Sequence, residues 1–257
     1  ADHRCARRGG ATRRLLSEAN SRVVQHDFEL HGASTLARRP FDPLGEGAAA
    51  VADEIKGSGG QAIATNCDVT DTIQVKDAVA KTLNTFGGIN FQFNSAGSAI
   101  RRSSFLDIEE ELWDRTFDLN AKSVFTCMQA VLPHMLDRGD GVIVNVASMS
   151  VKRGGPGTSV HYAAAKGAVT TMTMGVAREF ANQGIRCLSI SPGPIDTAFQ
   201  AASGTSPEIM QKFKDDVPMK RFGKPEEIAE LVLFLCSDAC TFMTADTIYV
   251  NGGGGWR

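Results

Sequence analysis

The sequence contains no long run of apolar residues and no marked excess of either charge. Of its 257 residues, 27 are Lys or Arg and 29 are Asp or Glu, so the net charge is −2. This balance gives no broad positive field for nucleic acid or an anionic membrane. No stretch approaches the ~18–20 apolar residues that cross a bilayer, and the basic N-terminus lacks the apolar core of ~7–15 residues of a secretory signal. We therefore expect a cytoplasmic protein with neither a membrane nor a nucleic-acid partner.

The six cysteines also lack the spacing of a metal or redox motif. No two of them form a Cys-x-x-Cys pair, which is the common arrangement in zinc and dithiol sites. Cys236 and Cys240 lie four residues apart near the end of a predicted helix, and we expect them to be small buried apolar side chains. The sequence thus predicts no metal site and a reducing compartment.

From about residue 33 onward, extended and helical patterns alternate. The predicted strands are 33–37, 61–66, 89–93, 142–146, 185–191 and 247–250. The predicted helices are 46–56, 71–86, 108–136, 159–182 and 225–236. Strands that alternate with helices of this length indicate a parallel sheet with right-handed crossovers. The length suits one α/β domain over residues 1–257, and no repeat or linker divides it.

The pair Tyr162 and Lys166 is the most informative feature of the chain. If residues 159–182 are helical, the two side chains share one face because they lie four residues apart. A fixed positive charge beside a phenol lowers its pKa from ~10, and a shift of about three units needs ~4 kcal/mol. The pair predicts a proton donor or acceptor for chemistry at a carbonyl or alcohol. Alone, the spacing also fits a half-buried tyrosine beside a solvated lysine.

Other polar residues follow the ends of predicted strands, where ligands bind in open α/β sheets. The segment Asn94-Ser95-Ala96-Gly97 follows one strand, Ser148 the next, and Pro192-Gly193 a third. Ser150 is an alternative to Ser148, but it lies two residues further from the strand.

The order and spacing of these motifs, together with Asn120, resemble the short-chain dehydrogenase/reductase family from about residue 22 to the C-terminus. The resemblance implies a single-domain Rossmann-type fold, a doubly wound parallel sheet with helices on both faces. It also implies NAD(P)-dependent hydride transfer between nicotinamide and a small-molecule carbonyl or secondary alcohol. The chain is similar both to 3-oxoacyl-acyl-carrier-protein reductases and to bacterial polyol or sugar dehydrogenases. The resemblance also implies a homotetramer, with the predicted helices 108–136 and 159–182 paired across one interface and residues 248–256 packed in the other.

The resemblance also implies four catalytic roles. Tyr162 would exchange a proton with the substrate oxygen, and Ser148 would hydrogen-bond and orient that oxygen. Lys166 would lower the pKa of Tyr162 and hold the nicotinamide ribose. Asn120 would hold a water that links Lys166 to solvent.

Cofactor contacts follow from the same resemblance. Asp68 and Val69 would meet the adenine, and Asn94, Ala96 and Gly97 would line the ribose and diphosphate path. Pro192, Gly193, Ile195 and Thr197 would hold the nicotinamide, beside Tyr162 and Lys166. Arg38 and Arg39 end the second strand of the family pattern, where arginines suit the 2′-phosphate of NADP. NADP is therefore expected and NAD is the alternative, because the arginines also fit a solvated turn.

The N-terminus departs from the family, which has a glycine-rich phosphate turn there. The turn should fall on residues 15–21, which contain no glycine, and the preceding strand on residues 1–14, which contain five arginines. Three explanations are open: a frame-shifted sequence, a divergent terminus that impairs cofactor binding, or a different phosphate site with donors from Ser17, Asn20 and Ser21. The second explanation leaves a non-catalytic binding member of the family as an alternative of another class.

The substrate is not specified by these motifs. We expect a lid over residues 198–217, with Phe199, Met210 and Phe213 for apolar contact. The four cations near the pocket mouth are Arg101, Arg102, Lys152 and Arg153. They fit an anionic substrate, an acyl carrier or ordinary solvated surface.

Overall fold

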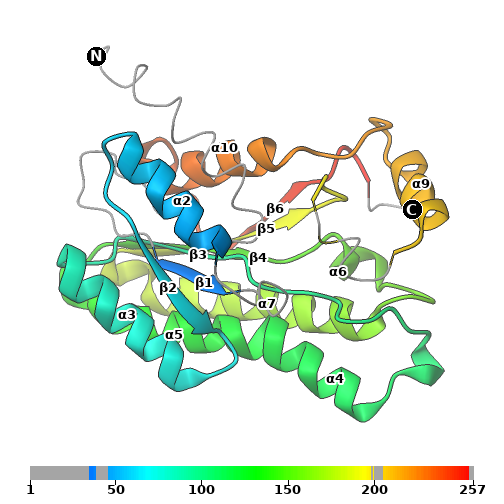
Figure 1. Ribbon diagram of the computed structural model, residues 1–257, viewed down its shortest axis with the longest axis horizontal. Coiled ribbons are helices and arrows are strands. Elements are labelled where there is room, and N and C mark those ends of the chain that lie inside the picture. Colours follow the sequence, from blue (N-terminus) through cyan, green and yellow to red (C-terminus); the bar gives the residue numbers. More distant parts are fainter. Residues whose placement is uncertain (1–34, 39–45, 198, 200–204, 255–257) are drawn as a thin grey trace.

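The computed structural model describes residues 35–38, 46–197, 199 and 205–254. The strands are β1 (Thr35–Arg38), β2 (Ile63–Asp68), β3 (Phe91–Asn94), β4 (Gly141–Val146), β5 (Ile185–Pro192) and β6 (Thr247–Val250). The helices are α2 (Glu46–Gly57), α3 (Thr72–Phe86), α4 (Glu110–Phe117), α5 (Ser123–Arg138), α6 (Ser150–Arg153), α7 (Val160–Phe180), α9 (Pro207–Asp216) and α10 (Pro225–Cys236). Strands and helices alternate along the chain, as the sequence predicted (Figure 1).

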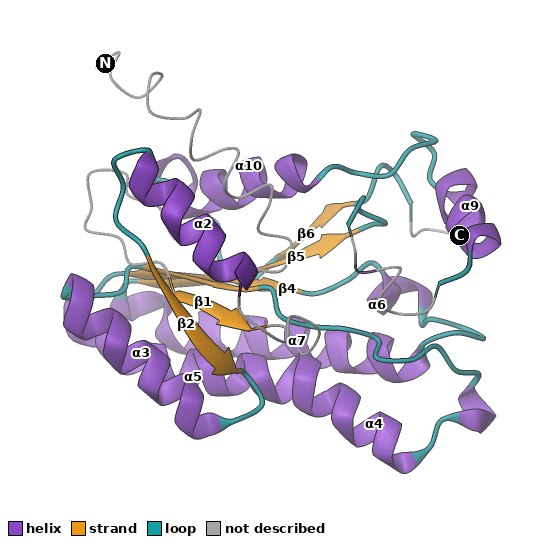
Figure 2. Cartoon of the chain, viewed as in Figure 1, coloured by secondary structure: helices purple, strands orange, loops and turns teal. Residues whose placement is uncertain are grey.

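All strand pairs among the described residues are parallel. β1 pairs with β2, and a second group has the order β3-β4-β5-β6. Figure 2 shows these strands between helices on their two sides. The strand expected in residues 1–14, the glycine-free turn at 15–21 and the donors proposed at Ser17, Asn20 and Ser21 lie outside the described residues.

The side-chain alternation along the central strands builds two apolar layers. On one face, Ile143 and Cys187 pack with residues of α5 and α7 such as Met128 and Val169. On the other face, Val144 and Leu188 pack with residues of α10, including Val232 and Leu235. Because both faces are covered, the strands are apolar on successive residues, as expected for a buried parallel sheet. The doubly wound α/β fold is thereby confirmed.

Local signals explain where several helices begin and end. The Asp71 side chain accepts hydrogen bonds from the amides of Ile73 and Gln74 and caps the start of α3. Gly87 follows that helix with φ of +79°, a conformation that glycine adopts without a steric penalty. Pro225 occupies the first turn of α10, where its missing N–H costs nothing.

The helix predicted over residues 108–136 consists of three parts. α4 passes into a π-helical turn, Asp118–Lys122, which passes into α5. No pattern in the sequence indicates this turn, which rotates the two helices relative to an uninterrupted α-helix. It places Leu119, Asn120 and Ala121 on the buried side.

Two helices were not predicted. α6 follows β4 after three residues, and α9 occupies half of the segment 198–217 expected as a lid. Ser206 caps α9 by accepting from the amide of Ile209, and Pro207 begins the helix. None of the helices in the described part of the chain is long and apolar enough to cross a membrane.

The cysteines that the structure describes, Cys67, Cys127, Cys187, Cys236 and Cys240, are all free thiols. Cys240 is buried, as predicted, and Cys236 packs against the same core while remaining partly exposed. Burial raises the pKa of Cys236 to about 12, so its thiol stays protonated and unreactive.

Candidate active site

A cavity of about 420 Å³ lies at the carboxyl ends of β3, β4 and β5. It is lined by nine of the residues predicted for the site: Ala96, Gly97, Ser148, Tyr162, Lys166, Pro192, Gly193, Ile195 and Thr197. These residues come from three separate strand ends and from α7, so the fold brings together residues that are spread over positions 96–197 of the sequence. Asp68, Val69, Asn94 and Asn120 do not line this cavity.

Tyr162 and Lys166 lie on α7 with their side chains on one face, as predicted. The Lys166 Nζ is 5.9 Å from the centroid of the Tyr162 ring. It donates a hydrogen bond of 2.7 Å to the carbonyl oxygen of Val146, at the end of β4. Lys166 is only 2% exposed, so the ammonium is held in the wall of the cavity.

The expectation that Lys166 lowers the pKa of Tyr162 is wrong for the cavity as it stands. Burial raises the pKa of Tyr162 to about 12, against the opposing effects of a hydrogen bond with Ser148 and the charge of Arg102. Burial also lowers the pKa of Lys166 to about 7. A lysine that loses its charge near neutrality has little electrostatic effect on a phenol, which explains the difference. The phenol is therefore kept protonated.

Ser148, rather than Ser150, is the serine whose hydroxyl acts on the tyrosine. It lowers the pKa of Tyr162 against the larger, opposite effect of burial, and its Oγ accepts from the amide of Ser150 at 3.1 Å. Ser150 also lines the cavity, but its buried Oγ has no partner among the described residues. The amide at the start of α6 thus holds the Ser148 hydroxyl in place.

Asn120 lies behind the cavity and braces the turn after β3. Its Oδ1 accepts from the Ser98 amide at 3.1 Å, and its Nδ2 donates to the carbonyl oxygens of Ser98 (2.7 Å) and Thr116 (2.9 Å). Gly97 fits against it because a Cβ there would lie 2.6 Å from Asn120 Oδ1 and 3.0 Å from Lys166 Nζ. The Asn120 side chain thus holds the turn after β3 in place, and its role in holding a water stays a prediction.

Asn145 was missed from the sequence, although it connects the strands that carry the site. Its Oδ1 accepts from Asn94 Nδ2 at 2.8 Å, and its Nδ2 donates to Thr173 Oγ1 at 3.0 Å. Asn145 is fully buried, so these bonds link β3, β4 and α7 inside the core. The available signal was a lone amide within the β-branched run 142–146, because a buried amide requires partners. The Asn94 side chain is one half of this link, and its contact with the cofactor stays a prediction.

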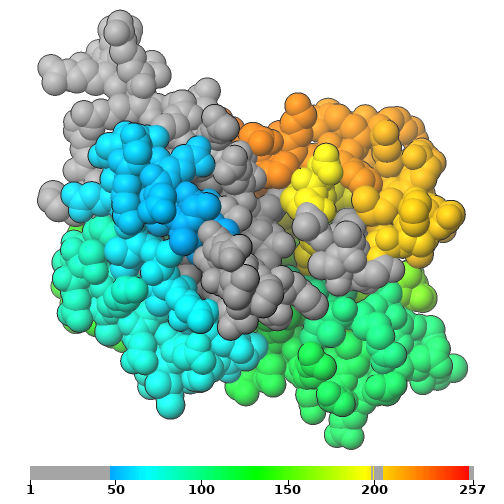
Figure 3. All heavy atoms as spheres, in the orientation of Figure 1, coloured from blue at the N-terminus to red at the C-terminus, as the bar shows by residue number. Residues whose placement is uncertain are grey.

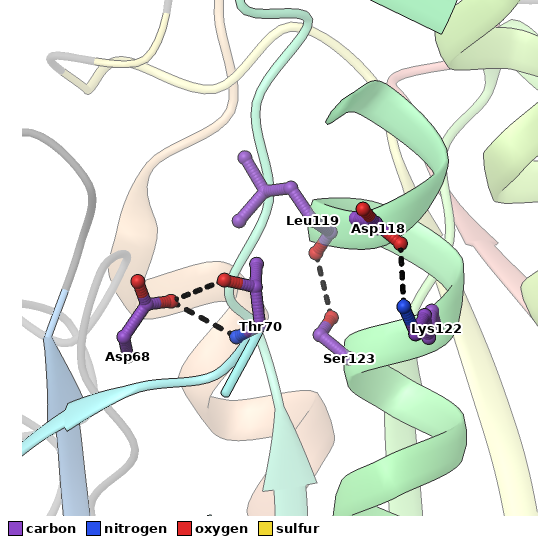
Figure 4. A network of polar contacts seen from close by, with 6 residues as sticks. All are labelled: Asp68, Thr70, Asp118, Leu119, Lys122 and Ser123. Atoms are coloured by element: carbon purple, nitrogen blue, oxygen red, sulfur yellow. Dashed lines mark hydrogen bonds and ion pairs between the residues drawn. The ribbon is translucent and has the colours of Figure 1, made fainter. Parts of the chain in front are cut away.

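Asp68 and Val69 lie at the end of β2, away from the cavity. The Asp68 carboxylate accepts from the amide of Thr70 at 2.9 Å and from its hydroxyl at 2.8 Å. Figure 4 shows this group in the same view as the π-helical turn, where Ser123 donates to the carbonyl oxygen of Leu119. Asp68 is exposed and Val69 is buried. Arg38 pairs with Asp68 across β1 and β2, so its backbone reaches the same edge, whereas Arg39 lies outside the described residues.

The expected lid residues divide between the cavity and the exterior. Phe199 and Phe213 line the cavity, whereas Met210 does not. The Phe199 ring lies 5.9 Å from the Tyr162 ring. In Figure 3, the gold segment containing α9 lies beside the yellow segment that follows β5, at one end of the molecule.

The four cations expected at the mouth of the cavity are also separated by the fold. Arg102 and Arg153 line the cavity, and Arg101 and Lys152 do not. Arg101 is exposed and pairs with Glu109 at 3.3 Å, and Lys152 lies over the ring of Tyr249. Arg153 forms an ion pair of 3.3 Å with Asp216 of α9. Arg102 therefore differs from the other three, because its charge acts on Tyr162.

A doubly wound parallel sheet with Ser, Tyr and Lys gathered at its carboxyl ends defines a Rossmann-type oxidoreductase. Residues 26–254 match the family model described as enoyl-(acyl carrier protein) reductase. The chain therefore belongs to the short-chain dehydrogenase/reductase family, and it is an oxidoreductase of that family.

Named relatives lie within the same family. The chain is 36% identical to a 3-oxoacyl-acyl-carrier-protein reductase of Staphylococcus aureus over 81% of this chain and 83% of the relative. It is 36% identical to the 2-keto-3-deoxy-L-fuconate dehydrogenase of Xanthomonas campestris, over 80% and 72%. Among solved structures, a 7α-hydroxysteroid dehydrogenase complexed with NADH and a 7-oxo bile acid has a TM-score of 0.78 and 30% identity, over 87% of this chain and 84% of that chain.

Proposed function

We propose that this protein is an NADP(H)-dependent enzyme that reduces a ketone, or oxidises the corresponding secondary alcohol, with Ser148, Tyr162 and Lys166 as its catalytic residues. The observation that carries the proposal is the meeting of these three side chains in one cavity at the ends of β3, β4 and β5. Packing alone does not require a hydroxyl, a phenol and a buried ammonium at one place, because each is costly to bury without a partner.

The geometry favours proton donation by Tyr162. A phenol with a pKa of about 12 remains protonated at neutral pH, so it is suited to donate to a carbonyl oxygen that gains negative charge. Ser148 lines the same cavity, and its hydroxyl would donate a second hydrogen bond to that oxygen. When bound, the nicotinamide supplies or accepts the hydride.

The residues around Lys166 fit the nicotinamide ribose. An ammonium has three hydrogens to donate, and Lys166 uses one on the Val146 carbonyl. Burial without a countercharge lowers the pKa of Lys166 to about 7, so hydroxyl acceptors at this place would stabilise its charged form. Lys166 would then replace the Tyr162 proton, and a water held by Asn120 would link Lys166 to solvent.

The preference for NADP rests on Arg38 and Arg39. Arg38 ends β1 beside Asp68 of β2, which is the edge where the resemblance places the adenosine. An arginine there suits a 2′-phosphate through paired hydrogen bonds. Asp68 and Val69 would contact the adenine, and the diphosphate would pass Ala96 and Gly97.

Two substrate classes are compatible with this site. The Staphylococcus aureus relative is named for 3-oxoacyl groups carried on a protein, and the Xanthomonas campestris relative for a keto sugar acid. Reduction with NADPH suits the first class, and a polyol or sugar dehydrogenase is the second. The apolar rings of Phe199 and Phe213 are compatible with either.

We also propose that the protein is a cytoplasmic homotetramer. Apolar side chains are exposed on both helices expected to pair across one interface, Phe125 of α5 at 48% and Met174 of α7 at 43%. The free thiols of the described cysteines fit a reducing compartment.

The direct test is fluorescence titration with NADPH and NADH, on protein whose intact mass matches the sequence. Micromolar binding of NADPH, at least tenfold tighter than that of NADH, is expected. No binding of either nucleotide at the correct mass would contradict an enzymatic role and leave a non-catalytic binding protein. A different mass would assign the glycine-free N-terminus to a sequence error.

A further inference from the structure

Arg102 carries a positive charge into the cavity that holds Ser148 and Tyr162. It lies in the loop between β3 and α4, and it is half-buried. Its Nε donates to Thr205 Oγ1 at 2.8 Å, and its guanidinium carbon lies 5.4 Å from the centroid of the Phe213 ring. The planar guanidinium is thus held between the catalytic side and the α9 side of the cavity. A guanidinium keeps its charge at all ordinary pH values.

The backbone before Arg102 adopts a strained turn. Ile100 has φ of +59°, a conformation that is exceptional for a β-branched residue. The turn is closed by the Arg101 amide, which donates to the Ala99 carbonyl at 2.6 Å, and the Ile100 amide donates to Ser98 Oγ at 2.9 Å. Such strain costs about 1–3 kcal/mol and persists only where the surroundings impose it.

The catalytic helix imposes this turn. His161, directly before Tyr162, is fully buried, and its Nε2 lies 3.1 Å from the Ala99 carbonyl oxygen and 3.2 Å from that of Arg101. Both contacts require Nε2 to carry the proton, since carbonyl oxygens only accept. The Ser103 amide donates to the Thr158 carbonyl at 2.9 Å. Residues on both sides of Arg102 are therefore fixed to the segment that carries Tyr162.

The electrostatics agree with this placement. Burial lowers the pKa of Arg102 from its ordinary value, and the charge of Tyr162 opposes this effect. Lys212 of α9 also lines the cavity, which adds a second positive charge. Arg153, a third cation of the lining, forms an ion pair of 3.3 Å with Asp216. The cavity therefore holds a positive charge beside its proton donor.

We propose that Arg102 binds a carboxylate of the substrate, so that the enzyme acts on oxo acids and the corresponding hydroxy acids. This inference rests on the proposed function and narrows its substrate class. A guanidinium pairs with a carboxylate through two parallel hydrogen bonds, which fixes the orientation of the adjacent carbonyl at Ser148 and Tyr162. Phe199 and Phe213 would cover the apolar part of a small acid.

The test uses acids and their methyl esters, which differ only in the charge. With saturating NADPH, kcat/KM is measured for 2-oxobutyrate, acetoacetate and 4-oxopentanoate and for the methyl ester of each. We expect the wild type to prefer at least one acid over its ester by tenfold or more. Arg102→Gln should raise the KM for that acid by about 10- to 100-fold, the range for a lost charge-assisted hydrogen bond, and leave the ester unchanged. Arg102→Lys should retain part of the preference.

Arg101→Gln is the matched control, because it removes the neighbouring charge, which is exposed and paired with Glu109. It should leave the acid preference unchanged. A wild type that prefers esters, a preference that survives in Arg102→Gln, or a higher kcat/KM for acetoacetyl-coenzyme A than for every acid would overturn the proposal.

Binding without turnover separates this inference from the proposed function. In Tyr162→Phe loaded with NADPH, the preferred acid should raise Tm, and the added Arg102→Gln change should abolish that shift. If NADPH binds but no acid in the panel is reduced or shifts Tm, carboxylate recognition is wrong while the oxidoreductase proposal stands. If NADPH does not bind, the proposed function fails.

Discussion

At the scale of single residues, Ser148 and Ser150 are the two candidates for the hydroxyl that orients the substrate oxygen. The Ser148 hydroxyl lowers the pKa of Tyr162, and Ser150 lies two residues later with its Oγ buried and unpartnered among the described residues. Both line the cavity, so exposure does not distinguish them, whereas the effect on the phenol does.

Ser148→Ala should lower kcat/KM by about 10²-fold, the scale for loss of one hydrogen bond to the reacting oxygen. The matched variant Ser150→Ala should change it less than fivefold. Steady-state kinetics with NADPH and the preferred ketone provides the measurement. Equal losses in the two variants would contradict the assignment of Ser148.

Lys166 connects the site to the pH dependence of stability. The ordinary pKa of a lysine is 10.5, and burial lowers that of Lys166 to about 7 in the folded protein. Between pH 7 and pH 10.5, the unfolded chain therefore binds a proton at this lysine that the folded chain lacks. This lysine therefore destabilises the ligand-free protein increasingly as pH falls from 10.5 to 7, and by a constant amount below 7.

Lys166→Met should raise the Tm of the ligand-free protein at pH 7 while abolishing turnover. The difference from the wild type should shrink as pH rises toward 10.5, because the wild-type lysine is then neutral in both states. Thermal unfolding at pH 7, 8.5 and 10 tests this, with Lys152→Met as the control for a lysine outside the cavity. If the stabilisation by Lys166→Met instead grew as the pH rose, the claim that the charged form of Lys166 destabilises the fold would be wrong.

At the scale of elements, Asn145 joins the ends of neighbouring strands. Its hydrogen bonds to Asn94 and Thr173 bind β3, β4 and α7 at the level where the strands deliver Gly97 and Ser148 to the cavity. A buried amide inside an apolar strand is stable only while all its partners are present.

Asn145→Ala should lower the free energy of unfolding by about 2–3 kcal/mol, because it leaves buried polar groups without partners. Thr173→Val removes only one of the bonds and should cost about 1 kcal/mol. Urea unfolding of both variants measures this. A loss in Asn145→Ala that does not exceed that in Thr173→Val would mean that the link between the strands is unimportant.

The helices and the sheet illustrate which structural features followed from local sequence. The alternation of extended and helical patterns predicted the long helices, because such patterns arise within a few residues of chain. The π-helical turn, α6 and α9 were missed. The turn at residues 118–122 is stabilised by the bonds of Asn120 to Ser98, which come from a distant loop and leave no periodic pattern in the sequence.

At the scale of the whole molecule, the proposed tetramer depends on exposed apolar residues of α5 and α7. Phe125 and Met174 should lie in a subunit interface, where burial of such side chains stabilises association. Light scattering should give a mass of four chains of 27.4 kDa each.

Phe125→Glu with Met174→Glu should lower that mass, because the interface would bury two charges. Ile73→Glu is the control, since Ile73 is 71% exposed on α3, which is not one of the helices expected to pair. A monomeric wild type, or an unchanged mass in the double variant, would contradict the proposed interface.

The sequence by itself determined the fold class and the family, and it supplied the residues proposed as catalytic, because strand–helix alternation and the spacing of Tyr162 and Lys166 are local patterns. Only the tertiary structure decided which charges matter. Arg101 and Arg102 are adjacent in sequence, but a turn held by His161 exposes the first and places the second in the cavity. The direction of the Tyr162 pKa was likewise decided by burial, which depends on contacts from strands and loops distant in the chain.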